Sequence, residues 1–192
     1  MFLTGFSGAR QSTCVTIAQR FCSEFCRAVS IPWNDSKFLF TATTGAAVSL
    51  FGGQTIHSAA FLCGNEKNIS KKKREERKHV RILIIDEISF FTRVNLQKLD
   101  KHLKNILGGQ DKHYGGLSIV FSGDFHQFWP IKCESHGILY KGVMNGLFEG
   151  SINTAIFLEI SHRFIEDPEY GTFMRQLWKG EITNEDIDKL ST

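Results

Sequence analysis

The chain has 192 residues, and 42% of them are hydrophobic, which suffices for one domain with a substantial core. Its formal net charge of +3 permits contact with a polyanion but does not require it. No apolar run approaches the roughly 20 residues that a bilayer-spanning helix needs, which excludes insertion into a membrane.

Strands and helices are expected to alternate along the chain. Apolar runs predict five strands, at residues 1–4, 37–42, 80–85, 117–122 and 154–158. A glycine turn at 5–8 leads into a helix from about Ser12 to Val29, and the clearest helix spans Arg93 to Leu107, where leucines recur at helical spacing. This alternation predicts an α/β fold, in which helices cover a mostly parallel sheet.

A dense run of charge, KKKREERK at residues 71–78, lies between the second and third predicted strands. A solvated helix or loop is the favoured interpretation, because its basic and acidic side chains lie within mutual reach. Contact with a nucleic-acid backbone is the alternative.

The five cysteines form no CxxC pair, and no secretory segment precedes them. They therefore predict a reduced, intracellular protein. Cys22 and Cys26 stand four residues apart on a predicted helix, but no second pair of Cys or His follows at the spacing of a zinc site. Two small, partly buried helix residues are the favoured interpretation.

Candidate chemistry begins at the end of the third predicted strand, where four branched aliphatic residues are followed by Asp86 and Glu87. In open parallel sheets, ligands bind at the carboxyl edge of the strands. An acid there can hold Mg²⁺, while its neighbour orients or deprotonates the water that attacks a nucleoside triphosphate. By itself, the pair is equally consistent with a strand that ends in a polar loop.

The next predicted strand also ends in polar residues, in the segment SGDFHQ at 122–127. Gln127 could hydrogen-bond a γ-phosphate or the attacking water. Two consecutive strands with polar carboxyl ends favour a shared site, although Gly123 and Asp124 could form only a turn.

The glycine turn should supply the phosphate cradle, and here the sequence departs from a working loop. Such a loop reads G-x-x-x-x-G-K-[ST], in which backbone N–H groups and the lysine hold phosphates and the hydroxyl reaches Mg²⁺. Gly5 and Ser12 fit this pattern, but Arg10 replaces the second glycine and Gln11 replaces the lysine.

Both replacements are expected to harm nucleotide binding. Arg10 places a bulky side chain where the backbone needs close approach or an unusual φ. Losing the charge-assisted contact at Gln11 costs on the order of 2–3 kcal/mol, so we expect weakened ATP binding and much weaker hydrolysis. The alternative is that the Arg10 guanidinium replaces the missing lysine charge.

Taken in order, these segments resemble the Pif family of superfamily 1 DNA helicases over nearly the whole chain. Residues 4–8 resemble motif I, 41–47 with 52–58 motif Ia, 85–89 motif II, 115–131 motif III, and 162–164 motif IV. Motif III of that family normally ends in Leu-Pro-Pro, and Phe128-Trp129-Pro130 departs from it. The resemblance implies the first RecA-like domain of a P-loop NTPase.

The resemblance also implies roles for individual residues. The catalytic set would be Asp86, Glu87, Gln127 and Arg163, with Glu87 activating water. Mg²⁺ would be coordinated by Ser12 and Asp86. ATP would be held by the turn and the start of the helix, at Gly5, Ser7, Gly8, Arg10, Gln11, Ser12 and Thr13.

Single-stranded DNA would follow a track that includes Thr43, Thr44, His57 and Ser58, through backbone contacts without sequence preference. Structural roles compete with these assignments. Thr43 and Thr44 could cap a turn, His57 could be a satisfied core histidine, and Arg163 could pair with Glu159 or Glu166.

By this resemblance, the protein is an ATP-dependent DNA helicase that couples ATP hydrolysis to 5′–3′ unwinding of DNA in repair, recombination and telomere maintenance. Its expected partners are single-stranded DNA and DNA junctions, and its expected compartment is the nucleus, with an organelle as the alternative. We expect a single motor domain over residues 1–192, without the second RecA-like domain that unwinding requires. Two rival hypotheses are a catalytically inactive DNA-binding fragment and a remnant of a transposon-borne helicase.

Overall fold

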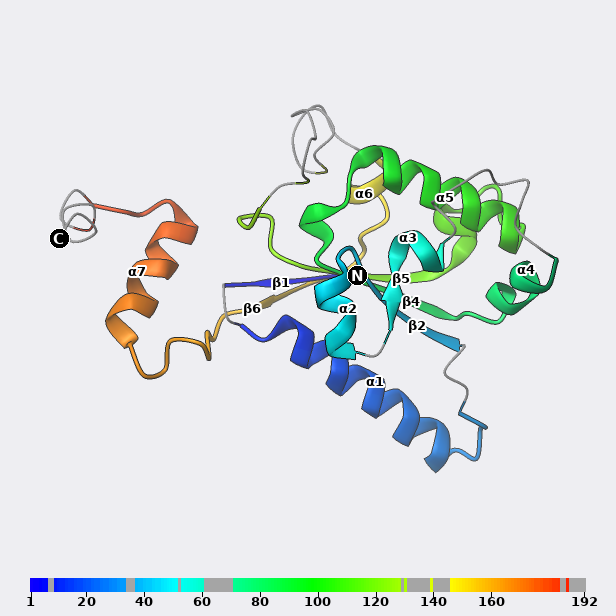
Figure 1. Ribbon diagram of the computed structural model, residues 1–192, viewed down its shortest axis with the longest axis horizontal. Coiled ribbons are helices and arrows are strands. Elements are labelled where there is room, and N and C mark those ends of the chain that lie inside the picture. Colours follow the sequence, from blue (N-terminus) through cyan, green and yellow to red (C-terminus); the bar gives the residue numbers. More distant parts are fainter. Residues whose placement is uncertain are drawn as a thin grey trace.

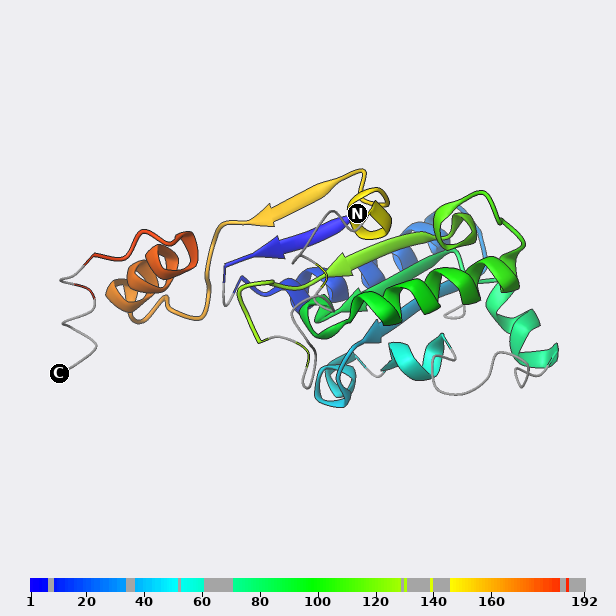
Figure 2. The same cartoon turned by 90° about the horizontal axis from the view of Figure 1, so that it is seen from above.

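The computed structural model describes residues 1–6, 9–33, 37–51, 53–60, 71–128, 130, 139, 146–183 and 186. Six parallel strands form one sheet in the order β3-β2-β4-β5-β1-β6. The strands are β1 (Phe2–Gly5), β2 (Phe38–Ala42), β3 (Gln54–Thr55), β4 (Ile82–Asp86), β5 (Ser118–Ser122) and β6 (Ala155–Leu158). Because every pair is parallel, all the carboxyl ends lie along one edge, toward which the arrowheads in Figure 2 point.

The predicted α/β class is confirmed, and every strand pair among the described residues is parallel. All five predicted strands are present, with each boundary within two residues of the prediction. The sequence did not predict β3, because a strand of two residues is too short to display an alternating pattern.

Helices connect the strands and cover both faces of the sheet. They are α1 (Gln11–Ala28), α2 (Gly45–Phe51), α3 (Ile56–Ala59), α4 (Lys71–Lys78), α5 (Arg93–Leu107), α6 (Gly146–Glu149) and α7 (Pro168–Lys179), with 3₁₀ turns η3 (Ile88–Phe90) and η4 (His113–Gly116). Figure 1 shows α1 on one face of the sheet and α5 on the other, with α7 beyond the carboxyl ends of β1 and β6.

Neighbouring residues of β4 pack into opposite layers, as the two-residue period of a strand requires. Leu83 and Ile85 belong to the core cluster that contains the buried leucines of α5. Ile84 belongs to a second cluster, in which α1 contributes Val15. The run of branched aliphatic residues in β4 is therefore explained by burial on both faces.

The α5 helix confirms its prediction at both ends. Leu96, Leu99 and Leu103 of its leucine stripe are buried, whereas Leu107 is only partly buried and Ile106 is buried instead. Thr92 caps the first turn, because its Oγ1 accepts a hydrogen bond from the Asn95 N–H at 3.1 Å. Gly108 ends the helix with φ of 82°, a left-handed conformation that favours glycine.

The charged segment 71–78 forms the helix α4, in agreement with the favoured interpretation. Lys78 pairs with Glu75 on its exposed surface. Arg77 instead lies half-buried and donates from Nε to the carbonyl oxygen of Ala59 at 3.1 Å. The helix is thus anchored to the α3 segment through one of its basic residues.

Cys22 and Cys26 are free and partly buried, as expected, whereas Cys63 and Cys133 lie outside the described residues. In the described part of the chain, no three His, Cys, Asp or Glu side chains gather closely enough to hold a metal ion. None of the helices in that part is long and apolar enough to cross a bilayer.

Candidate functional site

The start of α1 and the end of β4 meet in a direct hydrogen bond. Ser12 lies in the first turn of α1, and its Oγ donates to Oδ2 of Asp86 at 3.1 Å. Asp86 is the last residue of β4 and is only 3% exposed. A hydroxyl and a carboxylate thus lie side by side at the carboxyl edge, next to the N-terminus of an 18-residue helix whose first N–H groups favour anions. The structure thus brings together the two residues that were predicted to hold Mg²⁺, and their role as ligands stays a prediction.

Glu87 follows in a left-handed backbone conformation, with φ of 56°. Burial of this carboxyl raises its pKa above the ordinary value, and repulsion from Asp86 and Asp124 adds to the rise. Three acidic residues from the ends of β4 and β5 therefore act on one another electrostatically. A carboxylate with a raised pKa is a stronger proton acceptor once ionised, which is the property that a general base needs.

The phosphate turn shows the unusual backbone expected at Arg10. This residue caps α1 with φ of 56° and ψ of 42°, in the left-handed region where glycine is cheapest. The Gln11 side chain, which replaces the lysine, donates from Nε2 to the carbonyl oxygen of Gly5 at 3.4 Å. Thr13 is exposed, and Ser7 and Gly8 lie outside the described residues.

Gly5 is the last residue of β1, where the chain enters the phosphate turn. A Cβ at this position would lie 2.5 Å from the carbonyl oxygen of Leu158 in the neighbouring β6. The close approach of the two strands therefore requires glycine, independently of any ligand.

The loop after β5 packs directly on the acidic turn after β4. A Cβ on Gly123, which has φ of 151°, would lie 2.9 Å from the backbone nitrogen of Ile88. Asp124 is 1% exposed, and its Oδ1 accepts hydrogen bonds from the His126 N–H and from the Trp178 indole. The segment around Gly123 is thus a structural junction rather than an isolated turn.

The side chains of Gln127 and Arg163 are exposed and make no hydrogen bond or ion pair with another described residue. The backbone of Gln127 is fixed, since its N–H donates to the carbonyl oxygen of Asp124 at 3.2 Å. Arg163 lies between β6 and α7, past the same edge of the sheet. The pairing of Arg163 with Glu159 or Glu166 is absent from the ion pairs among described residues. Their roles at a γ-phosphate stay predictions.

Thr43 and Thr44, at the end of β2, make the structural contacts that competed with DNA binding. The Thr43 hydroxyl donates to the carbonyl oxygen of Glu87 at 2.8 Å, and its N–H donates to that of Asp86 at 3.1 Å. Thr44 Oγ1 accepts from the Ala47 N–H at 3.3 Å at the start of α2. Thr43 therefore supports the acidic pair, and the DNA contacts of both residues stay predictions.

His57 also has internal partners. Its Nε2 lies 3.1 Å from Nδ2 of Asn95, and its ring packs edge-on against Phe91. Burial lowers the pKa of His57, with a further contribution from Lys98, and Nδ2 of Asn95 can donate to Nε2 wherever that nitrogen carries no proton. Ser58 is exposed, and its N–H donates to Oγ1 of Thr55.

Sequence reasoning missed the role of Asp124, which it treated as part of a turn. The available signal was its position two residues after an apolar strand, close to the position that Asp86 has at the end of β4. Its partner Trp178 lies 54 residues further along the chain, in a helix that carries no motif. No local pattern could have paired them.

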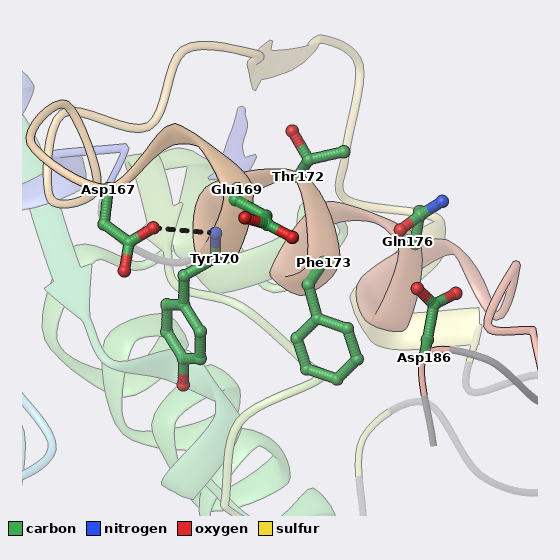
Figure 3. A pocket seen from close by; sticks show the side chains of 7 residues that line it. All are labelled: Asp167, Glu169, Tyr170, Thr172, Phe173, Gln176 and Asp186. Atoms are coloured by element: carbon green, nitrogen blue, oxygen red, sulfur yellow. Dashed lines mark hydrogen bonds between the residues drawn. The ribbon is translucent and has the colours of Figure 1, made fainter. Parts of the chain in front are cut away.

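A separate cavity of about 520 Å³ lies along α7 (Figure 3). Its described lining contains three carboxylates and two aromatic rings, from Asp167, Glu169, Tyr170, Thr172, Phe173, Gln176 and Asp186. None of the predicted site residues that the structure describes is part of this lining. Since carboxylates repel phosphates, this cavity does not fit a nucleotide.

The parallel sheet, the phosphate turn before α1 and the acidic residues after β4 and β5 define a RecA-like α/β domain. The chain belongs to the PIF1-like helicase family, whose sequence model matches residues 1–144.

Curated relatives carry helicase names. The ATP-dependent DNA helicase PIF1 of Candida albicans is 33% identical over 141 residues, covering 68% of this chain and 14% of that protein. The Saccharomyces cerevisiae helicases PIF1 and RRM3 are 29% and 26% identical, covering 76% and 95% of this chain and 18% and 25% of their own lengths. The chain therefore spans a quarter or less of these relatives.

Solved structures confirm the fold. The Pif1 helicase from Candida albicans superposes with a TM-score of 0.78 at 24% identity, over 98% of this chain and 42% of that one. The Bacteroides Pif1 helicase in complex with ADP-AlF3 and ssDNA gives a TM-score of 0.69 at 21% identity, over 99% of this chain and 44% of that one.

Proposed function

We propose that this chain is the first motor domain of an ATP-dependent DNA helicase, in which single-stranded DNA stimulates the hydrolysis of ATP. The hydrogen bond between Ser12 and Asp86 is the observation that carries the proposal. It joins the end of the phosphate turn to the acidic end of β4, the two elements that a magnesium nucleotide must bridge. The Bacteroides Pif1 helicase solved with ADP-AlF3 and ssDNA supports the choice of ligands.

Ser12 and Asp86 are the residues that would hold Mg²⁺. Their oxygen atoms suit this hard cation, which commonly takes one or two protein oxygens and completes its shell with phosphate and water. When bound, the ion neutralises charge on the phosphoryl oxygens.

Glu87 would accept the proton of the attacking water. Its raised pKa makes it a better base, and Thr43 fixes its backbone through the 2.8 Å hydrogen bond. Gln127 and Arg163 would contact the γ-phosphate from the loops that follow β5 and β6.

The phosphate turn limits this activity. Gln11 brings hydrogen-bond donors but no charge, and the backbone at Arg10 is held in a conformation that disfavours its side chain. ATP binding is therefore weak, and hydrolysis is slower still.

The proposed DNA track runs along the carboxyl edge, past Thr43, Thr44, His57 and Ser58. The side chain of Phe128, 83% exposed at the end of the loop that carries Gln127, would add a stacking surface for a base. In the complete protein we propose 5′–3′ unwinding of DNA and of DNA junctions, in repair, recombination and telomere maintenance, within the nucleus.

A phosphate-release assay with single-stranded DNA tests the proposal. We expect slow turnover that DNA stimulates and that Glu87→Gln abolishes, because the amide cannot accept the proton of water. Glu76→Gln on the exposed surface of α4 is the matched control and should leave turnover unchanged. Turnover that survives Glu87→Gln unchanged would refute Glu87 as the base.

The second candidate is a catalytically inactive DNA-binding fragment or a remnant of a transposon-borne helicase. Arg10 and Gln11 favour it, because they replace the two most specific residues of a phosphate loop. This candidate predicts that both the natural chain and the Arg10→Gly, Gln11→Lys double variant bind single-stranded DNA and that neither releases phosphate.

A further inference from the structure

The indole of Trp178 occupies the junction between α7 and the two loops that follow β1 and β5. Its Nε1 donates to Oδ1 of Asp124 at 3.1 Å, and Asp124 is almost fully buried. Its ring centroid lies 4.2 Å from that of His126. Both contacts belong to the loop that ends at Gln127 and Phe128.

The same indole also contacts the phosphate turn. The ring of Phe6, which follows Gly5, lies edge-on to Trp178 with centroids 5.0 Å apart. Phe157 of β6 closes the cluster, at 5.0 Å from Phe6 and 5.2 Å from Trp178. On the outer side, the Arg175 guanidinium lies 5.7 Å from the Phe6 ring centre. One side chain of α7 thus contacts both loops, beyond the point where β1 and β5 are paired in the sheet.

We propose that Trp178 is a positioning residue that couples the phosphate turn to the loop of Asp124, so that displacement of either loop disturbs the other. The coupling has a physical cause on each side. Moving Asp124 away leaves a buried carboxylate without one of its donors, and moving Phe6 away opens a gap in an aromatic cluster. This inference deepens the proposed function, because these loops carry the residues assigned to ATP.

Amide hydrogen exchange in the chain without nucleotide tests the coupling. The His126 N–H is bonded to Asp124 Oδ1, and the Ala9 N–H is bonded to the Phe6 carbonyl, so each amide reports on one loop. Trp178→Phe keeps an aromatic ring next to Phe6 but removes the indole N–H. We expect exchange to accelerate roughly fivefold at both amides, a factor typical of one lost hydrogen bond.

Two comparisons separate coupling from a general loss of stability. The amides of β4 report global unfolding, and their exchange should change less than that of the two loops. Trp33→Phe removes an indole that stacks on Phe38, and it should leave both loop amides unchanged. Phe6→Leu gives the reciprocal test, since it cuts the ring contact and should accelerate exchange at His126.

Acceleration at His126 alone in Trp178→Phe would show two independent contacts and would overturn the proposal. Acceleration of both amides only in proportion to β4 would overturn it too. The exchange rates require no nucleotide, so a failure to bind ATP counts against the proposed function and leaves this test intact.

Discussion

Arg10 holds an L side chain in the left-handed region, where Cβ approaches the following carbonyl oxygen. Ser30, in the turn after α1, has nearly the same conformation, with φ of 57° against 56° for Arg10. The two residues differ in position, since only Arg10 lies in the phosphate turn. They therefore allow backbone strain to be separated from ligand binding.

Arg10→Gly is expected to stabilise the chain by about 0.5–1 kcal/mol, the strain relieved less the entropy that glycine adds to the unfolded state. Thermal unfolding of Arg10→Gly and Ser30→Gly measures this effect, and both melting temperatures should rise. Only Arg10→Gly should also tighten ATP binding. An unchanged melting temperature for Arg10→Gly would show that its conformation carries no strain.

Glu87 is expected to destabilise the folded chain at neutral pH, because its pKa is raised there. Above the folded pKa, the Glu87 carboxyl is ionised, and its burial then lowers the free energy of unfolding. Below the unfolded pKa, near 4.3, the carboxyl is protonated in both states and this loss of stability disappears. Glu87→Gln should therefore raise the melting temperature at pH 7 and change it little at pH 4. An equal effect at both pH values would contradict the electrostatic cause.

Phe128 is expected to contribute to DNA affinity by stacking on a base. Phe128→Ala should weaken binding of single-stranded DNA about tenfold, within the 1–3 kcal/mol range of base–aromatic stacking. Phe21→Ala is the matched control, because this phenylalanine is 65% exposed on α1. Fluorescence anisotropy with a labelled oligonucleotide measures both, and equal losses in the two variants would exclude a specific stacking role.

Among the elements, the turns after β4 and β5 pack directly on each other at the site. Gly123 allows the second turn to approach the first, since any Cβ there would overlap the backbone at Ile88. The acidic residues are thus held together by backbone packing as well as by the support of Thr43. This junction is what fixes Asp86 and Glu87 relative to Asp124.

Gly123→Ala should destabilise the chain by about 2–3 kcal/mol, because steric overlap with the turn after β4 adds to the backbone strain. Gly108→Ala provides the control, since its φ is 82° and a Cβ there would meet nothing within 4 Å. Its cost should be about 1 kcal/mol from strain alone. Urea unfolding of both variants measures the difference, and equal costs would mean that the junction can relax.

Periodicity explains why the elements could be predicted better than their contacts. Buried strands produce continuous apolar runs, and the parallel order then brings Ser12 and Asp86 together although 74 residues separate them. The internal bonds of Thr43 and the link between Trp178 and Asp124 depend on the final packing of loops. Thr43 and Asp124, which lie in motif segments, therefore also make structural contacts that no sequence pattern reveals.

At the scale of the whole molecule, a RecA-like sheet brings a hydroxyl, an acidic pair and a second acidic loop to one edge, while the phosphate turn deviates at two positions. The fold and the acidic half of the site match the requirements of a motor domain. The deviation lies in the half that holds phosphates. Affinity for ATP is therefore the property that shows whether the altered phosphate turn limits the site.

An equilibrium titration of labelled ATP with Mg²⁺, on the natural chain and on the Arg10→Gly, Gln11→Lys double variant, tests this account most directly. Restoring the glycine and the charge should tighten binding roughly 30- to 150-fold, as expected from about 2–3 kcal/mol. Equal affinities, or no binding by either chain, would contradict the assignment of residues 5–12 and Asp86 as the nucleotide site.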